Sequence, residues 1–250
     1  ATEPAILLYL AMNYEKRTYR NRVSQNSLKS FHLCVRETDL LIHCDTDLYH
    51  KALECVYIYR RFIEAYIKKH PHFLTSLAPI RDDDLAPPIL RDMLKASLAA
   101  NVGPMATVAG AISEYVARDL LEMSQNVIVE NGGDIYLKCQ NEVRVGVFAG
   151  NSPLTYKIGL LLKPKQMPIG VCTSSGTVGH SLSFGKADAV CVLSKSSTLA
   201  DAAATAIGNL VKEKGDIRTA LEKGMKIHGV LGCLIVIGEH FGVIGDIELI

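Results

Sequence analysis

Residues 103–138, GPMATVAGAISEYVARDLLEMSQNVIVENGGDIYLK, hold the pattern that decides the fold of this chain. Apolar residues recur in the first part at steps of three and four, the spacing of one face of a helix. They are Met105, Val108, Ala109, Ile112, Val116 and Leu120. The β-branched run Val127–Val129 has the character of a buried strand, and residues 135–138 alternate as a second strand would. The stretch predicts a small-residue loop, a long amphipathic helix and two strands.

Another face of the expected helix carries charge. Glu114, Arg118 and Glu122 follow one another at intervals of four residues, so they share one side of a helix. The spacing predicts a stripe of charged side chains in contact with water.

Asn131-Gly132-Gly133-Asp134 separates the two expected strands. Asn-Gly and Gly-Asp suit the positive φ angles of a tight hairpin turn. Glycines between buried strands also let a ligand or another backbone approach closely. Both interpretations stay open from the spacing alone.

The composition restricts the class of protein. The chain has 250 residues, of which 48% are hydrophobic and 21% charged, as in a globular protein with a full core. A net charge of +1 gives no general attraction to nucleic acid or to an anionic membrane, so neither is expected as a partner. The seven cysteines form no CxxC pair and predict reduced thiols in a cytoplasmic protein.

The remaining pattern predicts helices at 48–69, 88–102, 199–214 and 216–223 among short strands. The closely spaced apolar runs between 143 and 171 favour an antiparallel meander, and the last strands are expected at 230–237 and 241–250. No linker divides the chain. We therefore expect one α+β domain over residues 1–250, with antiparallel sheet and packed helices, in which residues 1–13 form an N-terminal strand or tail.

The run LADAAATA places Asp201 and Thr205 four residues apart, on one face of a helix. Four small residues around them leave room for an ion or a phosphate. A carboxylate and a hydroxyl are hard oxygen ligands that suit Mg²⁺. The alternative is structural, because an acidic side chain early in a helix complements the helix dipole.

The run CTSSGTVGH, residues 172–180, combines hydroxyls and glycines ahead of a histidine. His180 is the histidine that we expect to take part in chemistry, since imidazole titrates near neutral pH. A histidine that is merely hydrogen-bonded within the loop is the competing interpretation. Cys172 is expected to be a buried strand residue rather than a nucleophile.

Four segments of this chain, taken in order, resemble the motifs of ApbE-like proteins, the FAD:protein FMN transferases. They are GPMATVAG, VIVENGGDIYL, TSSGT and LADAAATA. More narrowly, the chain from about Tyr14 onward is similar to an uncharacterised prokaryotic branch of that superfamily. The resemblance implies the ApbE-like, T-fold-like architecture. It implies a flavin nucleotide site and a divalent metal site, the second completed by a backbone carbonyl near Thr107. The implied nucleotide-binding residues are Gly132, Gly133, Asp134, Ser174, Ser175 and Gly176, and the implied metal ligands are Asp201 and Thr205.

The expected activity is transfer of FMN from FAD to a Ser or Thr hydroxyl of a protein, with Mg²⁺ on the pyrophosphate and AMP as the leaving group. Two departures from the transferases affect this expectation. Ala109 stands where they commonly have lysine, and their His-Ile-x-Asp-Pro segment is replaced by residues 177–181. The alternative is a non-catalytic flavin- or nucleotide-binding accessory protein in sulfide assimilation into homocysteine in anaerobes. A homodimer is a further possibility.

Overall fold

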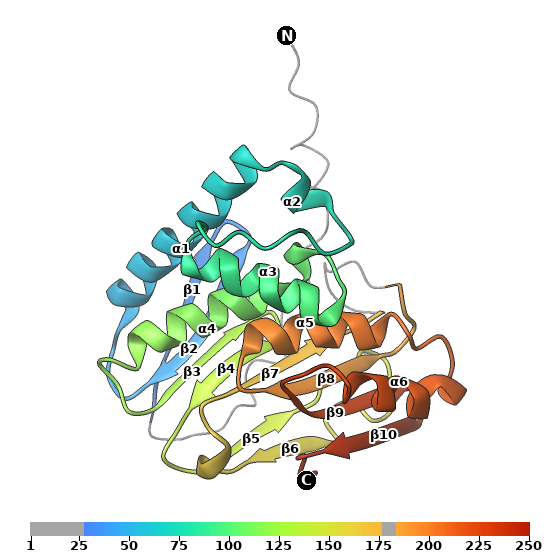
Figure 1. Ribbon diagram of the computed structural model, residues 1–250. Coiled ribbons are helices and arrows are strands. Elements are labelled where there is room, and N and C mark those ends of the chain that lie inside the picture. The colour runs from blue at the N-terminus through green and yellow to red at the C-terminus, as the bar shows by residue number, and fades with distance from the viewer. Residues whose placement is uncertain (1–27, 177–183) are drawn as a thin grey trace.

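One antiparallel sheet of eight strands organises the molecule, with strand order β1-β2-β3-β4-β7-β8-β9-β10 (Figure 1). The computed structural model describes residues 28–176 and 184–250. The tail expected at 1–13 and the proposed catalytic residue His180 lie outside these ranges. The α+β fold expected from the sequence is confirmed, as a single domain of helices packed on antiparallel sheet.

The strands are Lys29–Val35 (β1), Thr38–Cys44 (β2), Val127–Asn131 (β3), Asp134–Lys138 (β4), Val143–Gly146 (β5), Gly159–Leu162 (β6), Ile169–Ser174 (β7), Ala189–Ser194 (β8), Val230–Ile237 (β9) and His240–Gly245 (β10). The α-helices are Tyr49–Lys69 (α1), His72–Thr75 (α2), Pro88–Ala100 (α3), Val108–Leu120 (α4), Ser197–Gly208 (α5) and Ile217–Gly224 (α6). Short 3₁₀ turns cover Pro104–Thr107 (η3), Pro164–Gln166 (η4) and Lys214–Asp216 (η5).

The helices cover one face of the large sheet, and the β5–β6 hairpin covers part of the other (Figure 1). Side chains of β3 therefore point alternately into two cores. Val127 and Val129 pack with the helices, whereas Ile128 packs with residues of β5 and β6. Because both faces are covered, every residue of β3 is buried.

The meander expected between 143 and 171 is wrong. After β4 the chain leaves the large sheet, forms the separate pair β5–β6, and returns as β7 beside β4. The pattern in this region is still that of antiparallel strands with one buried face, since Val143 and Val145 are buried and Arg144 is exposed. Alternation along a strand identifies its buried face, but it does not identify the sheet that the strand joins.

Two boundaries also differ from the sequence-based expectation. Helix α5 ends at Gly208, where the expected helix continued to 214. Strand β10 ends at Gly245, and the last residues turn under the sheet, where Leu249 bridges Leu160 of β6. In each case backbone hydrogen bonds outside the element replace its regular pattern, as in the bond from the Leu161 N–H to the Glu248 carbonyl.

All seven cysteines are free, and all but Cys34 are buried. This agrees with the reduced thiols expected from their dispersed positions. Among residues 28–176 and 184–250, none of the helices combines the length and the apolar character that crossing a bilayer requires.

Candidate functional site

Helices α4 and α5 lie in direct contact near the start of each. A Cβ atom on Gly110 of α4 would lie 2.2 Å from the Ser197 carbonyl oxygen, so a larger residue cannot occupy that position without a shift of the backbone. The Ser197 hydroxyl donates to the Gly110 carbonyl at 2.7 Å. On the sheet side, a Cβ on Gly170 of β7 would lie 2.4 Å from the Ser197 Cα. The start of α5 is thus packed tightly between α4 and β7.

Each of these helices supplies a carboxylate to the beginning of the other. Asp201 of α5 accepts a hydrogen bond from the Gly110 N–H at 2.9 Å. Glu114 of α4 accepts from the Thr198 N–H at 3.0 Å, from the Thr198 hydroxyl at 2.9 Å and from the Ser196 hydroxyl at 2.8 Å. Each carboxyl thus supplies hydrogen-bond acceptors to N–H groups that have no partner within their own helix.

This geometry overturns the charge stripe expected on α4. Arg118 and Glu122 are exposed, but only 1% of the Glu114 side chain is. Helix α5 covers Glu114, and Thr198 of this helix and its capping residue Ser196 supply three hydrogen-bond donors. Arg118 forms an ion pair with the second carboxylate oxygen. The four-residue spacing identified a shared helix face, but nothing in it could show that another helix covers one end of that face.

The sequence left open that Asp201 stabilises its own helix by complementing the helix dipole. In the structure it stabilises the start of a different helix. Its own helix is capped by the Ser196 hydroxyl, which accepts from the Leu199 N–H. The Asp201 carboxylate instead caps α4, with backbone hydrogen bonds from Gly110 and Ala109.

The Gly-Gly corner is a hairpin turn between β3 and β4. Gly132 has φ of 67° and Gly133 has φ of 106°, and Asn131 pairs with Asp134 across the turn. A Cβ on Gly133 would meet only the Thr173 carbonyl oxygen, at 3.9 Å, so the backbone angle rather than crowding calls for glycine. The turn interpretation is confirmed.

This hairpin reaches the same end of α4 as Asp201. The Asn131 side-chain amide donates to the Ala109 carbonyl at 3.2 Å. Asp134 accepts from the Thr173 N–H of β7, also at 3.2 Å. Residues far apart in sequence, from β3, β4, β7, α4 and α5, therefore meet at one place.

Two acidic side chains lie at this place in a setting that disfavours their charge. Burial raises the pKa of Asp134 well above its usual range, and the Asp201 carboxylate raises it further. Burial likewise raises the pKa of Asp201 to about 7, against the hydrogen bonds from α4. Both carboxyls therefore hold a proton more readily than exposed ones, and a bound cation would favour their ionised forms in place of those protons.

Cys172 of β7 lies near the carboxyls of Asp134 and Asp201 and is fully buried, as expected. Its thiol donates to the Ser197 carbonyl oxygen at 3.2 Å. Burial raises the pKa of this thiol well above its usual range, and Asp134 and Asp201 raise it further. Cys172 is therefore a neutral packing residue rather than a nucleophile.

Ser174 ends strand β7 directly after Thr173, the donor to Asp134. It is 8% exposed, and its buried hydroxyl has no hydrogen-bond partner among the residues that the structure describes. A buried hydroxyl without a partner costs free energy, so it marks a place where a ligand or water can bind.

The other residues expected at the site are placed less directly. Thr205 lies one turn beyond Asp201 on α5 and is 8% exposed. The chain after Ser175 leaves the sheet, and the Gly176 N–H donates to the Ala187 carbonyl at 2.9 Å. A Cβ on Gly176 would lie 2.3 Å from the Gly185 carbonyl oxygen, so this glycine permits contact between two chain segments. The structure does not describe His180.

The residues present suit a hard cation that keeps part of its water shell. Asp201 and Thr205 offer oxygen donors, and Asp134 supplies a second carboxylate nearby. Within the described ranges, no group of three His, Cys, Asp or Glu side chains could enclose a metal ion. Such a donor set is typical of Mg²⁺ held jointly by the protein and a phosphate, rather than of a metal enclosed by side chains.

Comparison with known proteins gives close and distant relatives. A family model described as "AbpE bacteria" matches residues 20–243. A UPF0280 protein of Methanococcus maripaludis (strain C6) is 45% identical over 221 residues, which cover 86% of this chain and 90% of that protein. A UPF0280 protein of Methanocaldococcus jannaschii has the same identity and coverage, and one from Methanosarcina acetivorans is 39% identical over 225 residues, covering 88% of this chain and 87% of that protein.

Two solved structures share the fold at low sequence identity. The apo form of the flavinyl transferase ApbE from Pseudomonas stutzeri aligns with a TM-score of 0.52 and 13% identity, covering 87% of this chain and 94% of that one. The ApbE protein from Thermotoga maritima also aligns with a TM-score of 0.52 and 13% identity, covering 86% and 96%. The chain belongs to the ApbE-like family, in the branch formed by the UPF0280 proteins.

Proposed function

We propose that this protein binds a flavin dinucleotide through Mg²⁺ and transfers its FMN half to a protein hydroxyl. The observation that carries the proposal is that Asp134 and Asp201 lie close together at the start of α4. Ser174 directly follows Thr173, the donor to Asp134, and its buried hydroxyl has no hydrogen-bond partner among the described residues. Two neighbouring carboxyl groups offer hard oxygen ligands to a cation, and the Ser174 hydroxyl can donate a hydrogen bond to a phosphate or sugar oxygen.

In this proposal Asp201 and Thr205 hold the metal, and the hairpin 132–134 with residues 174–176 lines the nucleotide. When bound, Mg²⁺ would neutralise charge on the pyrophosphate. The acceptor oxygen forms a bond to the phosphorus of the FMN half, the bond from that phosphorus to the bridging oxygen breaks, and AMP leaves. The acceptor hydroxyl gives up its proton. His180 stays our prediction for the base that takes it.

A second candidate is a flavin- or nucleotide-binding accessory protein without catalysis, in sulfide assimilation into homocysteine. Ala109 at the start of α4 favours it. Its backbone is bonded to Asp201 and Asn131, but its methyl side chain cannot replace the charge of the lysine that transferases commonly have there. Both candidates share the metal-dependent nucleotide site and differ only in whether a bond to phosphorus is made.

Two calorimetric titrations of the full chain with FAD, one in Mg²⁺ and one in EDTA, test the metal-dependent nucleotide site that both candidates share. We expect binding that weakens at least about tenfold without the metal, a free-energy difference of about 1.4 kcal/mol. Equal binding in EDTA, or no binding with Mg²⁺, would overturn the proposal.

Release of AMP from FAD separates the two candidates. The transferase should release AMP together with FMN bound covalently to added protein from its own host. If FAD binds in a metal-dependent way and no AMP is released, the protein is the accessory protein and not the transferase.

A further inference from the structure

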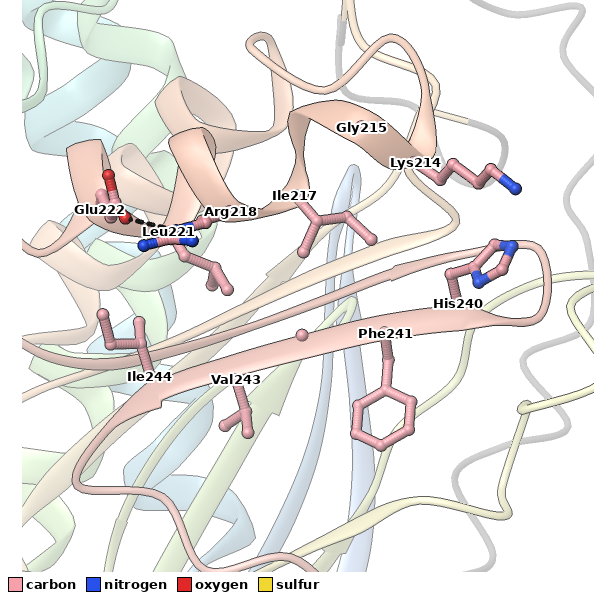
Figure 2. Close-up of a pocket in the computed structure, with 11 residues that line it drawn as sticks. Lys214, Gly215, Ile217, Arg218, Leu221, Glu222, His240, Phe241, Val243 and Ile244 are labelled. Atoms are coloured by element: carbon pink, nitrogen blue, oxygen red, sulfur yellow. Dashed lines mark hydrogen bonds and ion pairs between the residues drawn. The ribbon is translucent and has the colours of Figure 1, made fainter.

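The last strand of the large sheet, β10, has an unpaired edge with a groove beside it. Helix α6 lies over this strand, and the groove between them has a volume of about 610 Å³ (Figure 2). Among the described residues, β9 is the only strand that pairs with β10. The opposite edge of β10 therefore leaves backbone donors and acceptors available.

The residues that face this edge can be assigned from the hairpin. A two-residue turn joins β9 to β10, and Ile237 pairs with His240 where the hairpin closes. Hydrogen-bonded and non-bonded pairs alternate along an antiparallel ladder, so the backbone groups of Phe241 and Val243 point outward. Their side chains are 47% and 39% exposed. The free edge is thus apolar as well as unpaired.

The edge also lacks the charges that normally prevent strands from pairing between molecules. Strand β10, HFGVIG, contains no Lys, Arg, Asp or Glu. The strand at the other end of the sheet, β1, carries the exposed Lys29. Proteins commonly protect a free edge with such charges, above all lysine, and β10 has no such protection.

We propose that β10 pairs with β10 of a second copy of this chain, antiparallel about a two-fold axis at Gly242. In this register Gly242 faces its own equivalent, and Phe241 faces Val243 of the other copy. Phe241 and Val243 both present outward backbone groups, so the residues of each pair exchange both N–H···O bonds. The exposed side chains of these two residues then cover one another across the interface.

The charges above the strand favour a second copy over an unrelated partner. Lys214 lies at the His240 end of the groove, and Glu222 lies at the Ile244 end, where its Oε1 accepts a hydrogen bond from Arg218 at 3.0 Å (Figure 2). In the proposed register His240 of one copy faces Ile244 of the other. Lys214 of each copy is thereby brought toward Glu222 of the other, on both sides of the axis. An isologous interface requires this kind of self-complementarity.

Sedimentation equilibrium of the full chain tests the proposal. The wild type should have twice the chain mass of 27.3 kDa. Val243→Lys should be monomeric and should still unfold in one cooperative thermal transition, because it places charge on the edge without touching the core. Its melting temperature should fall only by the stabilisation that association supplies. Leu85→Lys makes the same change at a side chain that is 97% exposed in a loop, and should stay dimeric. A monomeric wild type overturns the proposal, as does a Val243→Lys dimer.

A cross-link tests the register. In a Cys34→Ser background, which removes the one exposed native thiol, Phe241→Cys combined with Val243→Cys should give a disulfide-linked dimer on oxidation. The Cα atoms of a hydrogen-bonded antiparallel pair are about 5.5 Å apart, within the range of a disulfide. Either cysteine alone should give none. A dimer that links equally well through one cysteine would contradict the axis at Gly242.

Discussion

The Glu114 carboxylate of α4 accepts a hydrogen bond from the Thr198 N–H at the start of α5, at 3.0 Å. Asp201 of α5 accepts in the same way from the Gly110 N–H at the start of α4, at 2.9 Å. The two contacts are reciprocal in geometry but differ in their surroundings. Glu114 has an arginine partner, whereas Asp201 lies near a second carboxylate, Asp134. We therefore expect Glu114 to serve stability and Asp201 to serve ligand binding.

Glu114→Gln should lower the free energy of unfolding by about 3 kcal/mol, because a neutral amide leaves Arg118 without its buried partner and weakens three hydrogen bonds. Urea unfolding measures the loss. Glu122→Gln removes a carboxylate from an exposed position just beyond the same helix and should change stability by less than about 0.5 kcal/mol. Equal effects of the two substitutions would show that the buried network contributes nothing.

Gly110→Ala should destabilise the protein by about 2 kcal/mol, although alanine favours a helix. Its methyl group would lie 2.2 Å from the Ser197 carbonyl, so α4 and α5 must move apart. Gly215→Ala is the control, since the nearest atom to its Cβ would be the Glu213 carboxylate at 3.7 Å. Thermal unfolding of both variants compares them. A Gly110→Ala protein as stable as Gly215→Ala would mean that the helices tolerate separation.

The sequence was sufficient to predict the local elements of this region but not their mutual contacts. Periodicity placed α4, and the positive-φ preference of Gly132-Gly133 placed the hairpin, because both depend on neighbouring residues. The burial of Glu114 depends on a helix about 80 residues away in sequence, and no local pattern encodes it. The same reason explains why β5, β6 and β7 were expected to follow one another in a single meander. The motif order identified the family and thereby named Asp201 and Asp134 as site residues, whereas Asn131 was not named because its contact with Ala109 is long-range.

Asp45 should make part of the stability depend on pH. Burial opposes ionisation of this carboxyl, but hydrogen bonds from Asn126, Ser124 and Gln125 outweigh it and lower the pKa of Asp45 below its ordinary value. A group with a lowered pKa in the folded state contributes stability above its unfolded pKa of about 4 and loses it as the pH falls through the folded value. Asp45→Asn should therefore be less stable than the wild type at pH 7, and the gap should shrink below pH of about 4. Urea titrations at a series of pH values measure that gap. A gap that does not change with pH would contradict the role of the charge.

Asp201→Asn should separate ligand binding from stability. The amide keeps an oxygen that can accept from the Gly110 N–H, and it removes a charge that burial and Asp134 disfavour. The melting temperature without metal should therefore stay the same or rise. If Asp201 holds Mg²⁺, the metal-dependent part of FAD affinity should fall at least about tenfold, or about 1.4 kcal/mol. FAD binding in EDTA should barely change.

Glu122→Gln, which removes an exposed carboxylate, is the matched control and should keep the full Mg²⁺ dependence. Melting temperature and FAD titrations with and without Mg²⁺ are measured on the same preparations of both variants. If Asp201 acts only as a helix cap, the opposite result is expected for Asp201→Asn. Stability should then fall by about 1 kcal/mol, and metal-dependent FAD binding should stay intact. That result would assign Asp201 to the support of α4 and remove it from the metal site.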